Sequence, residues 1–208
     1  MAIGAKEYIE TVTYLSKMYD YFNEKLFSNG LEKPVLTIHP DEKNKAYGWI
    51  TREKLWKENA DDEGMYEINL SAQFLNRPIS EIAATLIHEM CHQWAKANHF
   101  QDTARFGSFH NKLFRQIAES HGLHVELTRG RGWSVTTLEK STEGLLQTFI
   151  EQNPEKPVYR VMPIKVKRVR NIGVRKYVCP ECEASVRATK AVKVICGNCI
   201  KDMQEEKI

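Results

Sequence analysis

Residues 79–94 read ISEIAATLIHEMCHQW. Apolar residues recur in this stretch at helical spacing, and they predict a helix that opens near residues 78–80 and runs to about residue 98. At 100° per residue, His88 lies opposite Ile79, and His92 shares the face of His88. We therefore expect a helix with one face for the core and another for chemistry.

The order His88-Glu89-x-x-His92 puts two imidazoles one helical turn apart, close enough to share one metal ion. The Glu89 carboxylate lies beside the first ligand and can reach a water molecule on the metal without binding the metal itself. Zinc brings the pKa of such a water to about 7, so that a carboxylate can accept its proton as it attacks a peptide carbonyl. The motif predicts a zinc-dependent peptidase.

A catalytic zinc usually has three protein ligands and one open position, so a third ligand is needed. His99 shares the helix face, but it lies about 10 Å along the axis from His92. His110 begins a helix predicted over residues 108–121 and can swing back over the first helix. Glu119, the alternative, faces the opposite way on that helix. The residues favour His110 as the third ligand.

The rest of the first 153 residues alternates helical and strand-like stretches. A long helix is predicted to end at Ser28-Asn29-Gly30, and a short helix over residues 143–152. Three runs have strand character: residues 35–38, 47–51 and 65–70. This pattern predicts an α+β fold, a zincin-like metallopeptidase domain with helices packed on a small sheet, over residues 1–153. The Pro-containing segment 153–157 separates it from residues 154–208.

The last third of the chain holds two C-x-x-C pairs separated by 13 residues. Two such pairs at this spacing, joined by the strand-like runs 186–189 and 192–195, predict a small zinc ribbon. Four thiolates leave no open position, so its zinc is expected to be structural. The predicted ligands are Cys179, Cys182, Cys196 and Cys199.

Three stretches, Glu67 to Ser71, Pro78 to His92 and Phe109 to Phe114, together resemble the SprT-like metallopeptidase family. Its pattern is a strand, an H-E-x-x-H helix, a downstream His-Gly-x-x-Phe that supplies the third ligand, and often a terminal zinc ribbon. Some of its members digest proteins crosslinked to DNA. The resemblance therefore implies a zinc peptidase that acts on DNA-bound proteins.

Carried over residue by residue, the resemblance implies His88, His92 and His110 as ligands of a catalytic zinc and Glu89 as the catalytic acid and base. Asn111 stands where the family has Gly, which leaves the local backbone at the third ligand to be explained.

Charge is unevenly distributed along the chain. Residues 1–154 carry 17 Lys/Arg and 21 Asp/Glu, whereas residues 155–208 carry 13 and 6. A basic segment on an acidic body suggests a polyanionic partner, and few aromatic residues accompany it, so DNA would be bound through its phosphates. The predicted nucleic-acid-binding residues are Lys165, Lys167, Arg168, Arg170, Arg175 and Lys176.

Composition excludes several other classes. The hydrophobic fraction of 42% and the charged fraction of 27% are ordinary for a globular protein. No run approaches the roughly 18 apolar residues of a membrane span, and residues 1–7 lack the apolar core of a signal peptide. We expect a cytoplasmic protein with protein substrates and no membrane partner. The rival interpretation is a non-enzymatic, nucleic-acid- or polymerase-associated zinc-binding adaptor, which would have no need of Glu89.

Overall fold

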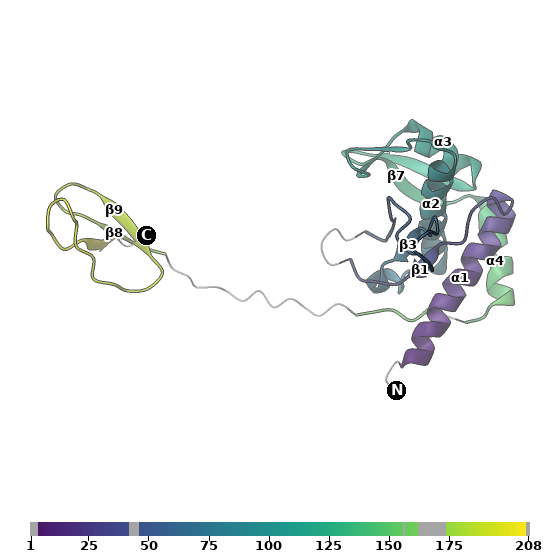
Figure 1. Cartoon of the computed structure of the whole chain (residues 1–208), viewed down its shortest axis with the longest axis horizontal. Coiled ribbons are helices and arrows are strands. Elements are labelled where there is room, and N and C mark those ends of the chain that lie inside the picture. Colours follow the sequence, from purple (N-terminus) through teal and green to yellow (C-terminus); the bar gives the residue numbers. More distant parts are fainter. Residues whose placement is uncertain (1–3, 42–45, 156, 162–173, 207–208) are drawn as a thin grey trace. The chain divides into compact units, whose positions relative to one another are not determined.

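The computed structural model describes residues 4–41, 46–155, 157–161 and 174–206. The chain divides into two compact units, residues 1–162 and residues 163–208 (Figure 1). The sequence predicted a boundary at residues 153–157, a few residues before the one in the structure. The segment after residue 157 stays with the first unit because Val158 N donates to Thr11 Oγ1 (3.0 Å) and Arg160 N donates to the Ala72 carbonyl (2.9 Å).

The first unit opens with α1 (Ala5–Phe27), whose buried face carries residues at helical spacing, among them Tyr19 and Phe22. Ser28 and Asn29 follow with φ of 53° and 59°, and Asn29 N bonds to the Asn23 carbonyl. This left-handed backbone ends the helix, as the predicted stop requires.

A three-stranded sheet lies beside α1, in the order β1 (Val35–Thr37), β3 (Glu67–Leu70), β2 (Gly48–Ile50). The central strand β3 runs parallel to β1 and antiparallel to β2. All three strands were predicted from the sequence, and each predicted strand is one or two residues longer than the observed strand. A short 3₁₀ helix, η1 (Ala72–Phe74), connects the sheet to the next helix.

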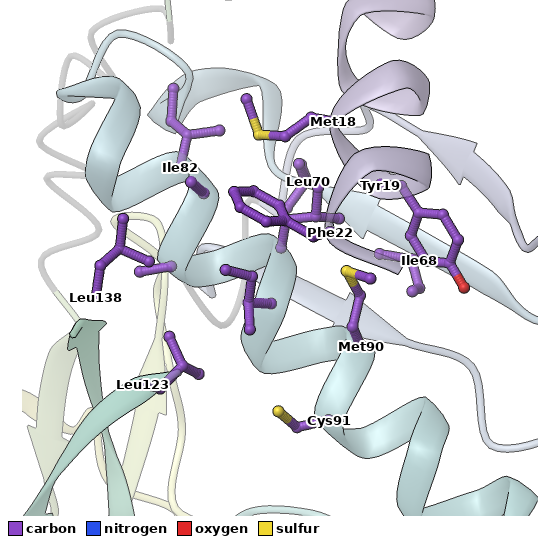
Figure 2. Close-up of a cluster of buried hydrophobic side chains, with 14 of the residues drawn as sticks. Met18, Tyr19, Phe22, Ile68, Leu70, Ile82, Met90, Cys91, Leu123 and Leu138 are labelled. Atoms are coloured by element: carbon purple, nitrogen blue, oxygen red, sulfur yellow. The ribbon is translucent and has the colours of Figure 1, made fainter. Parts of the chain in front are cut away.

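The next helix, α2 (Ile79–Ala97), runs through the middle of the first unit, and most of its residues are buried. Figure 2 shows how Ile82 and Met90 of α2 meet α1, β3 and the second sheet in one hydrophobic core. The helix was predicted to within a residue or two at each end. Its chemical face is covered as well as its core face, because a second sheet and another helix pack against it.

The second sheet has the strand order β4-β5-β7-β6. Only β6 and β7 are long, and they form an antiparallel hairpin. Two helices complete the unit, α3 (Lys112–Ser120) and α4 (Lys140–Gln152). The strands are β4 (Thr103–Ala104), β5 (Phe109–His110), β6 (Leu123–Thr128) and β7 (Gly132–Leu138).

The prediction that His110 begins a helix over residues 108–121 was wrong. His110 lies on β5, and α3 begins two residues later. The Asn111 side chain accepts hydrogen bonds from Leu113 N (2.8 Å) and Phe114 N (3.1 Å), which makes it the N-cap of α3. Its amide also donates to the Gln101 carbonyl (2.7 Å). Asn111 therefore fixes the backbone directly after His110.

The second unit contains an antiparallel sheet in the order β10 (Gln204–Glu206), β8 (Arg175–Val178), β9 (Ser185–Ala188). The strand expected at residues 192–195 is absent from this described unit, apart from an isolated bridge between Ile195 and Asp202. In the part of the chain that the structure covers, no helix is both long enough and apolar enough to cross a membrane.

Candidate active site

Three histidines from two elements meet in the first unit. His88 and His92 are one turn apart on α2, and His110 comes from β5. Their Nε2 atoms form a nearly equilateral triangle: His88 to His110 and His92 to His110 are both 3.1 Å, and His88 to His92 is 3.2 Å. The structure thus brings together the three histidines that the sequence indicated.

The partners of the three Nδ1 atoms indicate that each Nε2 atom in the triangle carries a lone pair and no proton. Nδ1 of His92 lies 2.5 Å from Asp102 Oδ2, and Nδ1 of His110 lies 3.4 Å from the Arg131 carbonyl. Nδ1 of His88 lies 3.2 Å from Thr136 Oγ1. A carboxylate and a carbonyl only accept, and a hydroxyl can accept, so this arrangement assigns the ring protons to Nδ1. The three Nε2 atoms then face one another unprotonated, as metal ligands do.

The pKa values point the same way. Burial, with added repulsion from His92 and His110, lowers the pKa of His88 well below its ordinary value. Burial and the neighbouring His92 lower the pKa of His110 to about 4. Both rings are therefore neutral near pH 7, which is the form that binds a cation.

The triangle has the dimensions of a zinc site. An ion about 2.0–2.1 Å from each of three nitrogens that are 3.1–3.2 Å apart makes N–Zn–N angles of about 100°. That is close to the tetrahedral angle, and three protein ligands leave a fourth position for water or substrate. The donor set therefore fits a catalytic zinc.

Phe114 supports the ligands from α3. Its side chain is fully buried, and its ring centroid lies 4.6 Å from each of the three imidazole centroids. One aromatic ring thus contacts all three ligands and limits their rotation. The same contacts make one wall of the site apolar, which excludes water from that side.

The sequence reasoning missed Asp102. This residue lies between α2 and β4, only 7% exposed, and its carboxylate bonds to His92. Its backbone carbonyl also accepts from Asn111 N (3.0 Å), which ties it to the residue after His110. One acidic residue in a short polar connection carries no periodicity. The only available signal was its position between the H-E-x-x-H motif and His110.

Glu89 is buried beside the triangle, with 6% of its surface exposed. Its oxygens are not among the donor atoms that converge with the three Nε2 atoms. Burial raises the pKa of Glu89 to about 7, with His92 opposing the rise and Asp102 adding to it. A buried carboxyl group with a pKa near neutrality can both accept and return a proton.

The other histidines and Glu119 lie away from the triangle. Glu119 pairs with Arg115 on the surface of α3 (2.7 Å), so it is not the third member of the cluster. His121 ends α3 and stacks on Phe27 at 4.3 Å, and His124 is exposed on β6.

A second donor cluster lies in the second unit, where the four predicted cysteine sulfurs fall within 4.8 Å of one another. Cys182 and Cys196 Sγ are 3.6 Å apart, and all five cysteines of the chain are free thiols. Sulfurs bound tetrahedrally at about 2.3 Å lie about 3.8 Å apart, so the cluster fits zinc. Backbone N–H groups of Cys199 and Asn198 lower the pKa of Cys196 to about 7, which favours its thiolate.

The six predicted nucleic-acid-binding residues divide into two groups. Lys165, Lys167, Arg168 and Arg170 lie outside the described residues. The other two lie on β8, where Arg175 pairs with Glu205 (2.7 Å) and Lys176 pairs with Glu206 (2.5 Å). These two cations already have acidic partners on β10.

A family model described as the SprT-like family matches residues 15–137. The match runs from α1 to β7 and so includes both sides of the histidine triangle. Comparison with curated proteins and with solved structures gave no significant match.

Proposed function

The chain belongs to the SprT-like family, and we propose that it is a zinc metalloendopeptidase with a zincin-like catalytic domain. The observation that carries the proposal is the convergence of three unprotonated Nε2 atoms next to a buried glutamate that is not itself a ligand. A purely structural site fills its fourth position and has no use for a free carboxyl group there.

His88, His92 and His110 would hold the catalytic zinc. When bound, zinc supplies Lewis acidity, which polarises a peptide carbonyl and makes a water molecule more acidic. Glu89 would accept the proton of the attacking water and later deliver it to the leaving amine. Burial, which raises the pKa of Glu89 to about 7 in the metal-free site, favours a carboxyl group that can hold the proton between these two steps.

The surrounding residues keep the ligands in place. Asp102 holds the Nδ1 proton of His92, so Nε2 stays available, and the Arg131 carbonyl does the same for His110. Phe114 excludes water beneath the three rings. The four ribbon cysteines would bind a second, structural zinc, since a unit this small has a core of few apolar residues.

We further propose that the substrates are proteins on DNA, including crosslinked ones, and that residues 163–208 bind the DNA. Support comes from the basic run before β8 and from the family resemblance. The ribbon itself adds little charge: residues 174–206 carry six Lys/Arg and five Asp/Glu, a difference of one. Binding would therefore depend on Lys165, Lys167, Arg168 and Arg170.

Cleavage of a basic DNA-binding protein, with and without DNA, tests this proposal. We expect zinc-dependent cleavage that DNA stimulates, because both proteins would be tethered to one strand. Replacing the four cations of the basic run with glutamine should remove the stimulation and reduce the salt dependence of DNA binding. If wild type and the glutamine variant cleave equally and DNA changes neither rate, the DNA proposal is discarded and the peptidase proposal is kept. Absence of cleavage by zinc-loaded protein would favour a non-enzymatic adaptor.

A further inference from the structure

Two surface loops frame the third histidine, and both carry arginines. The loop between β4 and β5 contains Arg105, whose guanidinium lies 5.2 Å from the centre of the Phe109 ring, next to His110. The turn between β6 and β7 contains Arg129 and Arg131, and the Arg131 carbonyl accepts from His110 N at 2.9 Å. We call Arg105, Arg129 and Arg131 the arginine rim.

The loop geometry holds the rim close to the site. Gly132 approaches the His110 backbone so closely that a Cβ there would lie 2.0 Å from the His110 carbonyl oxygen. Its φ of 73° also favours glycine. Gly132 thus lets the turn that carries Arg131 lie directly against β5, and a side chain at this position would push the two apart.

The charge of the rim is not balanced by acidic residues. All three arginines are exposed, and within the described residues none of them forms an ion pair. The nearest acid in sequence to Arg105 is Asp102, which is buried and bonded to His92. The first 154 residues nevertheless carry four more acidic than basic residues. The rim is therefore a local positive surface on an otherwise acidic unit.

An aromatic side chain lies beside the rim. Phe106 is 91% exposed, and its backbone carbonyl accepts from the Arg52 guanidinium at 2.5 Å. The Arg52 guanidinium also lies 5.8 Å from the centre of the Phe106 ring. An exposed apolar ring in an arginine-bearing loop suits contact with an extended polypeptide, which offers both apolar and charged side chains.

We propose that the arginine rim selects polypeptide substrates with acidic side chains close to the scissile bond, an inference that rests on the proposed peptidase function. An extended peptide advances about 3.3 Å per residue, so a side chain two or three residues from the reacting carbonyl lies about 7–10 Å from the metal. An arginine side chain based next to His110 reaches that zone, and its planar fork matches a carboxylate.

Phosphate groups of a nucleic acid would satisfy the same guanidinium groups. The Arg131 carbonyl, however, contacts both the backbone N–H and the ring of His110, so a group bound by Arg131 lies beside the third histidine. A substrate chain must enter there, whereas a nucleic acid in that position would compete with the substrate. We therefore assign the rim to the substrate.

The test compares two peptides that differ only in having Glu or Gln two and three residues from the cleaved bond. With full-length, zinc-loaded protein we expect kcat/KM to be about five- to tenfold higher for the Glu peptide, with a smaller ratio at high salt. The R105Q/R131Q variant should bring the ratio to about one. The control K6Q/K140Q, which removes the same charge from α1 and α4, should keep the wild-type ratio.

A ratio of one for the wild-type protein would overturn the inference. So would competitive inhibition of Gln-peptide cleavage by single-stranded DNA that R105Q/R131Q relieves, since the rim would then be a phosphate site. If zinc-loaded protein cleaves neither peptide, the proposed function fails, and fluorescence polarisation of the same peptides decides about the rim. Tighter binding of the Glu peptide, lost in R105Q/R131Q, would keep the inference, and equal binding would end it.

Discussion

Asp102 Oδ2 lies 2.5 Å from His92 Nδ1, and both residues are buried, with 7% and 8% of their surfaces exposed. The carboxylate fixes the ring tautomer and makes Nε2 a better donor to a metal. Because Asp102 acts through His92, it is a positioning residue, and its removal should be felt first in metal affinity.

We expect Asp102→Asn to weaken zinc binding at the histidine site by about 10- to 100-fold. Asparagine keeps the shape of the side chain but provides a neutral partner for Nδ1. Competition with a zinc-binding dye measures the affinity, and the four-cysteine site in the same molecule is the internal reference. Glu119→Gln is the control, because its carboxylate pairs with Arg115 instead of a ligand. Wild-type affinity in Asp102→Asn would show that the contact does not tune the site.

The two zinc sites should differ in lability. The histidine site has an open fourth position, whereas the cysteine site is closed. Brief chelation should therefore remove one zinc while the ribbon thiols stay unreactive towards a thiol reagent, and longer chelation should expose four of them. Cys91 is fully buried and adds no background while the first unit is folded. Loss of the first zinc together with reactive thiols, or one zinc at saturation, would contradict the two-site description.

Glu89 should make the metal-free first unit less stable as pH rises. Its pKa is about 7 in the folded protein against an ordinary 4.5, so the folded state binds the proton more tightly. The stability that this proton contributes is complete below about pH 4.5 and is lost as pH rises through about 7. Glu89→Gln does not ionise, so its free energy of unfolding should exceed that of wild type by about 1 kcal/mol at pH 5 and by about 3 kcal/mol at pH 8.

Urea unfolding of the chelated proteins measures this difference. All four tryptophans lie in the first unit, so their fluorescence reports on that unit alone. The comparison between wild type and Glu89→Gln cancels the opposing contributions of His88 and His110, whose pKa values are lowered. An equal gap at pH 5 and pH 8 would mean that Glu89 does not titrate in this range.

The long helices could be predicted from sequence because each buries a face at regular spacing. The two-residue strands β4 and β5 could not, since two residues have no period: β4 forms by pairing with β5, and β5 by pairing with β4 and β7. Because β5 was not predicted, the third helix was predicted to start at residue 108. Its true start is marked by the capping side chain of Asn111. The convergence of His110 with His88 and His92 was nevertheless predicted, because the requirement for a third ligand does not depend on the element that carries it.

In the ribbon, the cysteine spacing indicated the metal cluster but not the strands. The run 192–195 has strand character in sequence, yet β8 pairs with β9 and β10 instead. Local propensity alone does not fix this fold, because the unit buries few apolar side chains and its four cysteine sulfurs converge in space. Ion pairs of the kind that Arg175 and Lys176 make with β10 likewise could not be read from a count of charges.

The Glu89→Gln variant separates zinc binding from catalysis. Zinc content and cleavage of an unfolded protein are measured on the same preparations of wild type and variant. We predict that Glu89→Gln keeps both zinc ions, because Glu89 is not a ligand. Cleavage should fall by at least about 10²- to 10⁴-fold, because the proton acceptor is lost. A variant that keeps both zinc ions and cleaves at the wild-type rate would contradict the account.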